Sequence, residues 1–243
     1  MEALPANYQA ALDKLAQRLP ALLGENLFAC ILYGSAVRGD VTPGVSDLNL
    51  LIILNESTPE AHSAIADCLD GKVKVELFVI GRRGMERSFQ SFALKFRSIK
   101  RNYRLICGTD PLGEFAVSDE RVRFTLEQSL RNLRLRSVHN YIYLRKHPER
   151  YRQFLLNVYT AVFTDISEIL RLEGVEVATA YTGRIQTIEK FFDIKAPILA
   201  KLLAIKNHPE QFNAEQITAL HEGLFGLLHH IITWMEERWP IQR

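Results

Sequence analysis

The chain has 243 residues, of which 47% are hydrophobic and 24% charged, and its formal net charge is +2. This balance is typical of a soluble globular protein, long enough to form one large domain or two small ones. Uninterrupted apolar runs fall short of the roughly 18–20 residues of a membrane span, and the start lacks the pattern of a secretory signal, so a cytoplasmic protein is expected. Cys30, Cys68 and Cys107 are widely spaced and are predicted to be reduced core residues.

The first half of the chain alternates helix-like and strand-like segments. Leucines at helical spacing open it, and short apolar runs bounded by turn residues follow. The predicted elements are, in chain order, a helix over 5–23, a strand over 28–33, a loop over 39–46, a strand over 48–54, a helix over 58–69, a strand over 72–80, a helix over 85–102 and a short strand over 103–107. Together they predict a compact domain with both helices and strands over residues 1–115.

The second half contains amphipathic helical patterns only. Helices are predicted over 119–147, 149–173, 184–193 and 196–206, with a last helix capped by Asn213. Pro148 and Gly174 bound the second of them. Consecutive amphipathic helices bury their apolar faces against one another, so residues 119–243 are predicted to form an all-α bundle.

The most informative segment runs from Leu32 to Leu54, LYGSAVRGDVTPGVSDLNLLIIL. A buried strand ends at Gly34-Ser35, where the missing Cβ of glycine lets an anion approach the backbone and serine offers a hydroxyl and an amide. Asp47 begins the next strand, and Asn49 points to the same side because side chains alternate along a strand. The pattern predicts a phosphate site beside two oxygen ligands suited to Mg²⁺.

This segment resembles the DNA polymerase β-type nucleotidyltransferases, a superfamily that includes the aminoglycoside nucleotidyltransferases and small minimal members. Their pattern is Gly-Ser, about ten residues, then Asp-x-Asp; Gly34, Ser35 and Asp47 match it, and Arg38 matches the frequent Gly-Ser-x-x-Arg-Gly form. The resemblance implies an α+β fold, with a nucleotidyltransferase-type mixed sheet, flanking helices and the helical bundle after it.

The resemblance also implies roles for individual residues. Gly34, Ser35 and Arg38 would bind the phosphates of an NTP, with ATP the expected nucleotide, and Asp47 would bind Mg²⁺. The family's third carboxylate, a metal ligand and general base on a later strand, would be Glu76. A strand glutamate is equally explained as a half-exposed partner of a lysine such as Lys74, and the sequence leaves both interpretations open.

Asn49 departs from the family pattern, which has its second aspartate at this position. The amide oxygen is still a ligand, but the site loses one negative charge, which weakens cation binding by about 1.5–3 kcal/mol. Two hypotheses follow. The chain transfers a nucleoside monophosphate from an NTP to a small-molecule or protein acceptor, with weak activity, or it is a degenerate nucleotide-binding or regulatory protein of the same fold.

Basic residues concentrate over 82–104 and 121–152. Solvated helix faces are the ordinary explanation, and a positive surface facing a polyanion is the alternative. Arg134 and His139 resemble the Arg-x4-His of RNA-cleaving helical bundles, although nucleic acid is not the expected partner. The expected partners are a nucleoside triphosphate and an acceptor that the sequence does not identify. No membrane association is expected, and the formation of a homodimer is left open.

Overall fold

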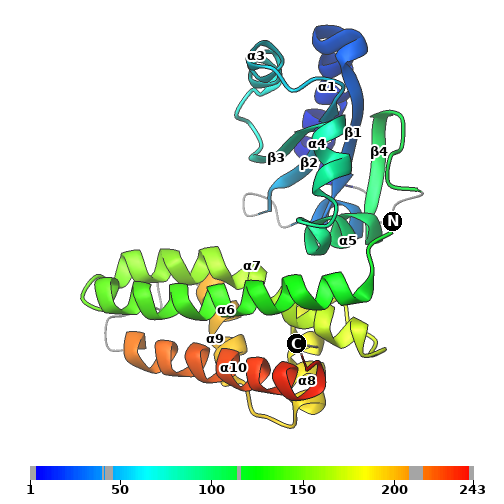
Figure 1. Cartoon of the computed structure of the whole chain (residues 1–243). Helices are drawn as coiled ribbons and strands as arrows, with labels where there is room; N and C mark the ends of the chain where they lie inside the picture. The colour runs from blue at the N-terminus through cyan, green and yellow to red at the C-terminus, as the bar shows by residue number, and fades with distance from the viewer. Residues whose placement is uncertain (1–3, 40, 42–45, 114–115, 208–215, 241–243) are drawn as a thin grey trace. The chain divides into compact units, whose positions relative to one another are not determined.

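The computed structural model describes residues 4–39, 41, 46–113, 116–207 and 216–240. The chain divides into two compact units, residues 1–121 and residues 122–243 (Figure 1). The first combines a sheet with helices, and the second is helical, so the predicted α+β class is confirmed. No helix within the described segments is both long and apolar enough to cross a membrane.

A four-stranded mixed sheet forms the centre of the first unit. Its strands are β1 (Leu27–Tyr33), β2 (Leu48–Leu54), β3 (Val75–Gly81) and β4 (Tyr103–Gly108). The spatial order is β3-β2-β1-β4; β1 is antiparallel to both β2 and β4, whereas β2 and β3 are parallel. The short strand predicted over 103–107 is therefore a genuine edge strand of this sheet.

Helices cover both faces of the sheet (Figure 1). On one face, α1 (Ala6–Leu23) and α3 (Pro59–Cys68) pack their apolar stripes, such as Leu12 and Leu15, against alternate strand residues such as Leu50. On the other face, α4 (Arg82–Ser88) and α5 (Ala93–Arg101) bury Met85 and Phe96 against the remaining strand residues. Because β1 and β2 are buried on both faces, their sequences are nearly continuous apolar runs.

Two predicted boundaries in this unit are wrong. The helix expected over 85–102 is instead two helices separated by a turn at residues 89–92, in which the Phe92 N–H donates to the Ser88 carbonyl at 2.8 Å. Phe89 and Phe96 pack edge to face there at 5.0 Å between ring centroids. The strand expected from Lys72 begins instead at Val75, because pairing with β2 starts there, opposite Leu48.

The start of α3 and the state of the cysteines agree with prediction. Thr58 caps α3 by accepting a hydrogen bond from the backbone N–H of Ala61 at 3.3 Å, and a proline opens the helix. Cys30, Cys68 and Cys107 are free thiols. Although Cys30 and Cys107 are distant in sequence, they are partners across β1 and β4.

The second unit consists of five helices within the described residues. They are α6 (Asp119–Leu144), which begins at the unit boundary, α7 (Pro148–Leu172), α8 (Tyr181–Phe192), α9 (Pro197–Asn207) and α10 (Gln216–Arg238). Helix α8 starts three residues earlier than predicted, and Asn213, the predicted cap of the last helix, lies outside the described residues. Helix α7 is the central element, because one face of it is buried along its whole length.

Polar groups are buried in this helical unit as well. The Asp165 side chain on α7 accepts a hydrogen bond from the Ser129 hydroxyl on α6 at 2.7 Å. Burial raises the pKa of the Asp165 carboxyl to about 7, an effect that the Ser129 hydrogen bond partly opposes and the nearby Glu168 reinforces. Arg131 on α6 bonds Glu236 on α10 at 2.6 Å, which ties the first bundle helix to the last.

Gly108 generates a stability prediction. Its φ is +88°, and a Cβ there would clash with the carbonyl oxygen of Phe28 and lie 2.8 Å from the Ala29 Cα. Gly108→Ala is expected to lower the free energy of unfolding of the first unit by at least about 2 kcal/mol, measured by chemical denaturation. Gly71→Ala is the control: its φ is +69° but nothing lies within 4 Å, so only about 1 kcal/mol of backbone strain is expected. Equal losses in the two variants would contradict the steric explanation.

Asp165 generates a pH prediction. Its carboxyl has a folded-state pKa of about 7, above the roughly 3.9 of an unfolded aspartate. The helical unit should therefore lose stability as the pH rises from about 4 through 7, because the unfolded chain ionises first. Asp165→Asn should flatten this dependence, read by hydrogen exchange of α7 peptides at several pH values. The exposed Asp193→Asn is the control, and an unchanged pH dependence in Asp165→Asn would refute the assignment.

Candidate active site

The candidate site lies at one end of the sheet, where three strands bring their termini together. Because β1 is antiparallel to β2 and β3 is parallel to it, the carboxyl end of β1 meets the amino ends of β2 and β3. Tyr33, the last residue of β1, lies opposite Asn49, near the start of β2. The predicted phosphate turn and the predicted metal ligands therefore share one end of the sheet.

Gly34 makes the turn after β1 with a φ of +81°, a conformation in which glycine avoids the strain of other residues. A Cβ at this position would lie 3.2 Å from the Asn49 side-chain nitrogen, so the turn packs directly against β2. Ser35 then begins α2 (Ser35–Arg38), a single helical turn that ends at Gly39 with a φ of +83°. The backbone N–H groups of Val37 and Arg38 donate to the Gly34 carbonyl, at 3.2 and 3.4 Å, so the amides of Ser35 and Ala36 at the start of the turn are the ones suited to an anion.

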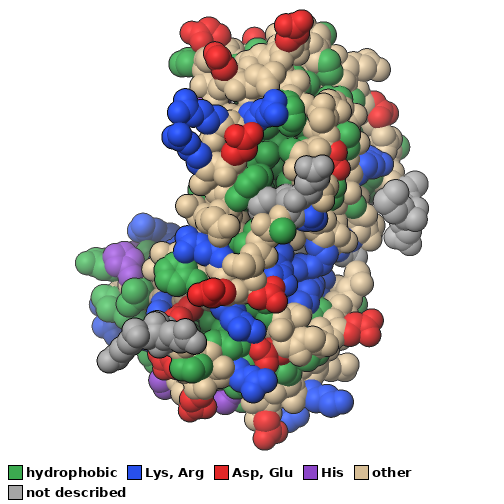
Figure 2. All heavy atoms as spheres, turned by 45° about the vertical axis from the view of Figure 1, so that its right-hand side comes forward, with side chains coloured by type: hydrophobic (Ala, Val, Ile, Leu, Met, Phe, Trp, Pro, Cys, Tyr) green, Lys and Arg blue, Asp and Glu red, His purple; other side chains and the backbone are tan. Residues whose placement is uncertain are grey.

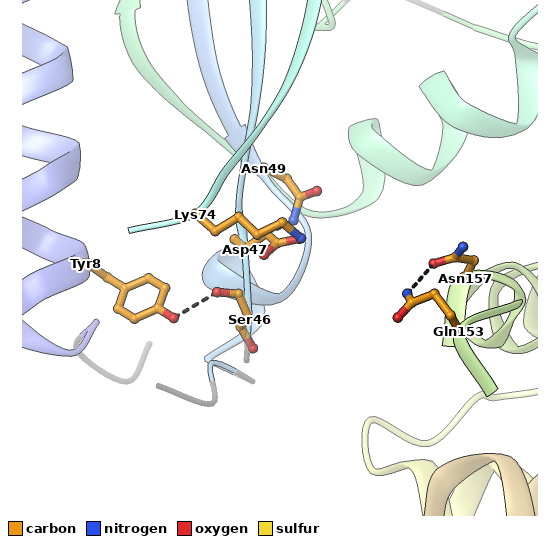
Figure 3. Close-up of polar contacts among 7 residues, drawn as sticks. All are labelled: Tyr8, Ser46, Asp47, Asn49, Lys74, Gln153 and Asn157. Carbon is orange, nitrogen blue, oxygen red and sulfur yellow. Dashed lines mark hydrogen bonds and ion pairs between the residues drawn. The ribbon is translucent and has the colours of Figure 1, made fainter. Parts of the chain in front are cut away.

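Asp47 is held just before β2 by contacts on both sides of it (Figure 3). The Tyr8 hydroxyl of α1 donates a hydrogen bond to the Ser46 carbonyl at 2.8 Å, which anchors the backbone beside Asp47. The Lys74 ammonium bonds Asp47 Oδ2 at 2.8 Å. This hydrogen bond, with the attraction between the two charges, raises the pKa of Lys74. Lys74 is therefore a fixed positive charge at the predicted metal ligand.

Asn49 and Glu76 are direct partners in the parallel ladder of β2 and β3. Partners in a sheet project to the same face, so their side chains lie next to each other at this end. The Asn49 amide nitrogen donates to the Asp47 carbonyl at 3.3 Å, which leaves its side-chain oxygen as the atom available to a cation (Figure 3). Glu76 is exposed, as a carboxylate that meets solvent-borne ligands must be.

The alternative interpretation of Glu76 was that it is the ion-pair partner of Lys74, and the contacts of Lys74 bear on it. Lys74 forms its ion pair with Asp47, and Glu76 contributes only a weaker electrostatic effect that also raises the Lys74 pKa. Arg38 is exposed at the end of α2, directly after the Ser35 turn. The structure thus brings Gly34, Ser35 and Arg38 to the same end of the sheet as the predicted metal ligands.

The oxygen ligands present fit one hard divalent cation. No group of three or more His, Cys, Asp or Glu side chains with metal-binding geometry occurs among the described residues. Asp47, Asn49 and Glu76 nevertheless offer two carboxylates and an amide oxygen. Mg²⁺ is commonly bound by one or two carboxylates, with water and substrate phosphates completing its shell, so this set is sufficient for a single ion.

Many residues of the two basic stretches have partners. Arg82 pairs with Glu86, and Arg97 with Asp119, within the first unit. The Lys95 ammonium lies 5.0 Å from the centroid of the Tyr33 ring. On the surface of the helical unit seen in Figure 2, acidic side chains lie among the basic ones. These pairs favour the interpretation as solvated helix faces over a continuous positive surface.

The residues of the RNA-cleavage hypothesis have separate neighbours. Arg134 approaches His229 at 3.4 Å, whereas His139 is exposed and packs on Tyr143 at 4.7 Å between ring centroids. Nothing in these contacts favours a cleavage site on α6.

Sequence reasoning missed two residues of the site. Tyr8 is one of several buried residues on α1 and has no feature that distinguishes it from other core residues. Lys74 was considered only as a partner of Glu76. Its pairing with Asp47 follows from the parallel register of β2 and β3, which the alternation in KVKVE does not reveal.

Comparisons with known proteins agree with this geometry. Residues 12–106, less than half of the chain, match the model of the nucleotidyltransferase domain family. Among solved structures, the chain is similar to spectinomycin adenyltransferase from Enterococcus faecialis, determined with ATP and spectinomycin, with a TM-score of 0.58 and 16% identity; the match covers 89% of this chain and 98% of that one. At this identity the similarity concerns the fold. A search of curated proteins gave no match.

The family match includes the Gly34-Ser35 turn, Asp47 and all of β3, and the structural similarity extends over most of the chain. Residues 12–106 therefore match a nucleotidyltransferase domain, in agreement with the resemblance of the Gly34–Asp47 segment to the DNA polymerase β-type nucleotidyltransferases.

Proposed function

We propose that the protein transfers a nucleoside monophosphate, with ATP as the expected donor, to a hydroxyl of a small-molecule acceptor. The observation that carries this proposal is the convergence of the Gly34-Ser35 turn, Asp47 and Glu76 at one end of the sheet. The solved structure with a similar fold holds ATP and spectinomycin, which supports both a nucleotide and a small-molecule acceptor. A protein acceptor is the alternative within the same reaction.

Each residue has a distinct task in the proposed reaction. The Ser35 hydroxyl and the amides at the start of α2, those of Ser35 and Ala36, bind the terminal phosphates, and Arg38 adds positive charge beside them. Asp47, the Asn49 amide oxygen and Glu76 would hold Mg²⁺. When bound, this ion neutralises charge on the triphosphate and on the leaving pyrophosphate.

Glu76 is the proposed general base. The acceptor oxygen forms a bond to the α-phosphorus, the bond from that phosphorus to the pyrophosphate oxygen breaks, and the acceptor proton passes to the Glu76 carboxylate. An exposed carboxylate next to the metal ligand Asn49 suits this role, since it is accessible to an acceptor entering from solvent.

A second candidate is a nucleotide-binding protein without catalysis. Asn49 favours it, because the site has one negative charge fewer than the family pattern, and the ion pair of Lys74 with Asp47 further reduces the charge available to a cation. In this alternative the Ser35 turn still binds nucleotide, but transfer does not follow.

Substitutions at Asp47 and Asn49 separate the two candidates. We expect the unmodified protein to transfer AMP from ATP to spectinomycin, the probe acceptor, with Mg²⁺ present, and Asp47→Ala to lower the rate on the order of a hundredfold or more, measured by mass spectrometry of the adenylylated product. Asp70→Ala is the matched control. Asp70 forms a comparable ion pair with Lys14, 2.9 Å between the two side chains, and this pair does not belong to the site.

Asn49→Asp completes the test. An active parent whose rate rises about ten- to a hundredfold in Asn49→Asp is a weak enzyme limited by its metal site. An inert parent that binds ATP and gains transfer only in Asn49→Asp is the degenerate protein of the second candidate. A parent that neither binds ATP nor loses anything in Asp47→Ala would contradict both.

A further inference from the structure

Lys74 is placed beside Asp47 by the backbone, not by chance contact of two flexible side chains. The backbone N–H of Leu48 donates to the Lys74 carbonyl at 2.9 Å, so the first residue of β2 is joined to the residue immediately before β3. The Lys74 ammonium then reaches Asp47 Oδ2 at 2.8 Å. The β2–β3 register therefore keeps Lys74 within reach of this carboxylate.

The register defines a group of four polar residues on one face of the sheet. Leu48 pairs with Val75 and Asn49 with Glu76, so one step back along both strands places Asp47 beside Lys74. Side chains two residues apart on a strand share a face. The four-residue group is therefore Asp47, Asn49, Lys74 and Glu76.

The charge of this group suits one divalent cation. Two carboxylates and one ammonium give a net charge of minus one, because Asn49 is neutral. With aspartate at position 49 and a neutral residue at position 74, the same group would carry minus three. Two divalent ions clamped at one site need that larger negative charge to offset their mutual repulsion, and a single ion does not.

We infer that the Lys74 ammonium takes the electrostatic place of a second cation, so that the site binds one divalent ion per chain and Lys74 contacts the bound triphosphate. This inference rests on the proposed function, because it concerns the same site. Asp47 can serve both cations at once: Oδ2 accepts from Lys74, and the second carboxylate oxygen remains a metal ligand.

The exposure of the pair fits this role. The Lys74 side chain is 76% exposed and that of Asp47 22%. An ion pair so open to solvent contributes little to folding stability, so Lys74 is replaceable without loss of the fold. The same exposure leaves the ammonium within reach of an incoming phosphate.

Mn²⁺ binding, followed by electron paramagnetic resonance, tests the inference without an activity assay. The unmodified protein should bind one Mn²⁺ per chain in the presence of a non-hydrolysable ATP analogue. Lys74→Met should bind Mn²⁺ about tenfold more tightly, because a positive charge close to the ion is removed. The double variant Asn49→Asp/Lys74→Met should bind two ions. Lys14→Met is the control, since it breaks another Lys–Asp pair of this unit.

Nucleotide binding measured without metal distinguishes two roles of Lys74. In one, Lys74 contacts the phosphates of the nucleotide; in the other, it only forms its ion pair with Asp47. In EDTA, Lys74→Met should bind the ATP analogue about tenfold more weakly than the unmodified protein, measured by calorimetry, as expected for loss of one charge-assisted contact. Unchanged binding in EDTA, unchanged Mn²⁺ affinity in Lys74→Met, or two Mn²⁺ ions in the unmodified protein would each overturn the inference.

Asp47→Ala distinguishes this failure from failure of the proposed function. If Asp47→Ala binds Mn²⁺ as the unmodified protein does, the metal site itself is wrong, and both the proposed function and the role of Lys74 fall. If Asp47→Ala loses Mn²⁺ while Lys74→Met behaves as the unmodified protein, only the role of Lys74 is overturned. Unchanged melting temperatures of the variants show that the fold is intact in each comparison.

Discussion

The hydrogen-bonded register of β1, β2 and β3 is the constraint on which the candidate site depends. Antiparallel pairing sets Tyr33 opposite Asn49, and parallel pairing sets Asn49 opposite Glu76. Because side chains alternate along a strand, a slip of one residue in either pairing would turn these groups to the opposite face. The two apolar clusters hold the register, since strand residues on each face are buried against helices.

The local backbone of the site is built from contacts that have little to do with catalysis. Tyr8 reaches from α1 to the Ser46 carbonyl, and Gly34 turns with a positive φ against Asn49. These contacts position the chain on either side of β2 before any ligand arrives. Preorganisation of this kind lowers the cost of ordering a site when a charged ligand binds.

Electrostatics distinguish this site from the family pattern it matches. The loss of one carboxylate at Asn49 and the presence of Lys74 both move the charge of the sheet end in the positive direction. Asn49 lies two residues after Asp47 along β2, and Lys74 lies directly beside Asp47. Both therefore act on the same predicted metal ligand. Considered together they are consistent with the single-ion site that we propose, whereas Asn49 considered alone indicates only the loss of a ligand charge.

The sequence by itself determined the class of the fold, most helices and strands, and the resemblance to nucleotidyltransferase domains. Apolar runs, helical spacing and cap residues are local signals, and the Gly-Ser and Asp segments lie within one short stretch, so both are readable along the chain. Only the tertiary structure decided which strands are parallel, and therefore that Lys74 lies beside Asp47 and that Glu76 lies beside Asn49. The interruption between α4 and α5 was likewise missed. The physical reason is that strand pairing joins residues far apart in sequence, and alternating apolar residues are compatible with either direction of pairing.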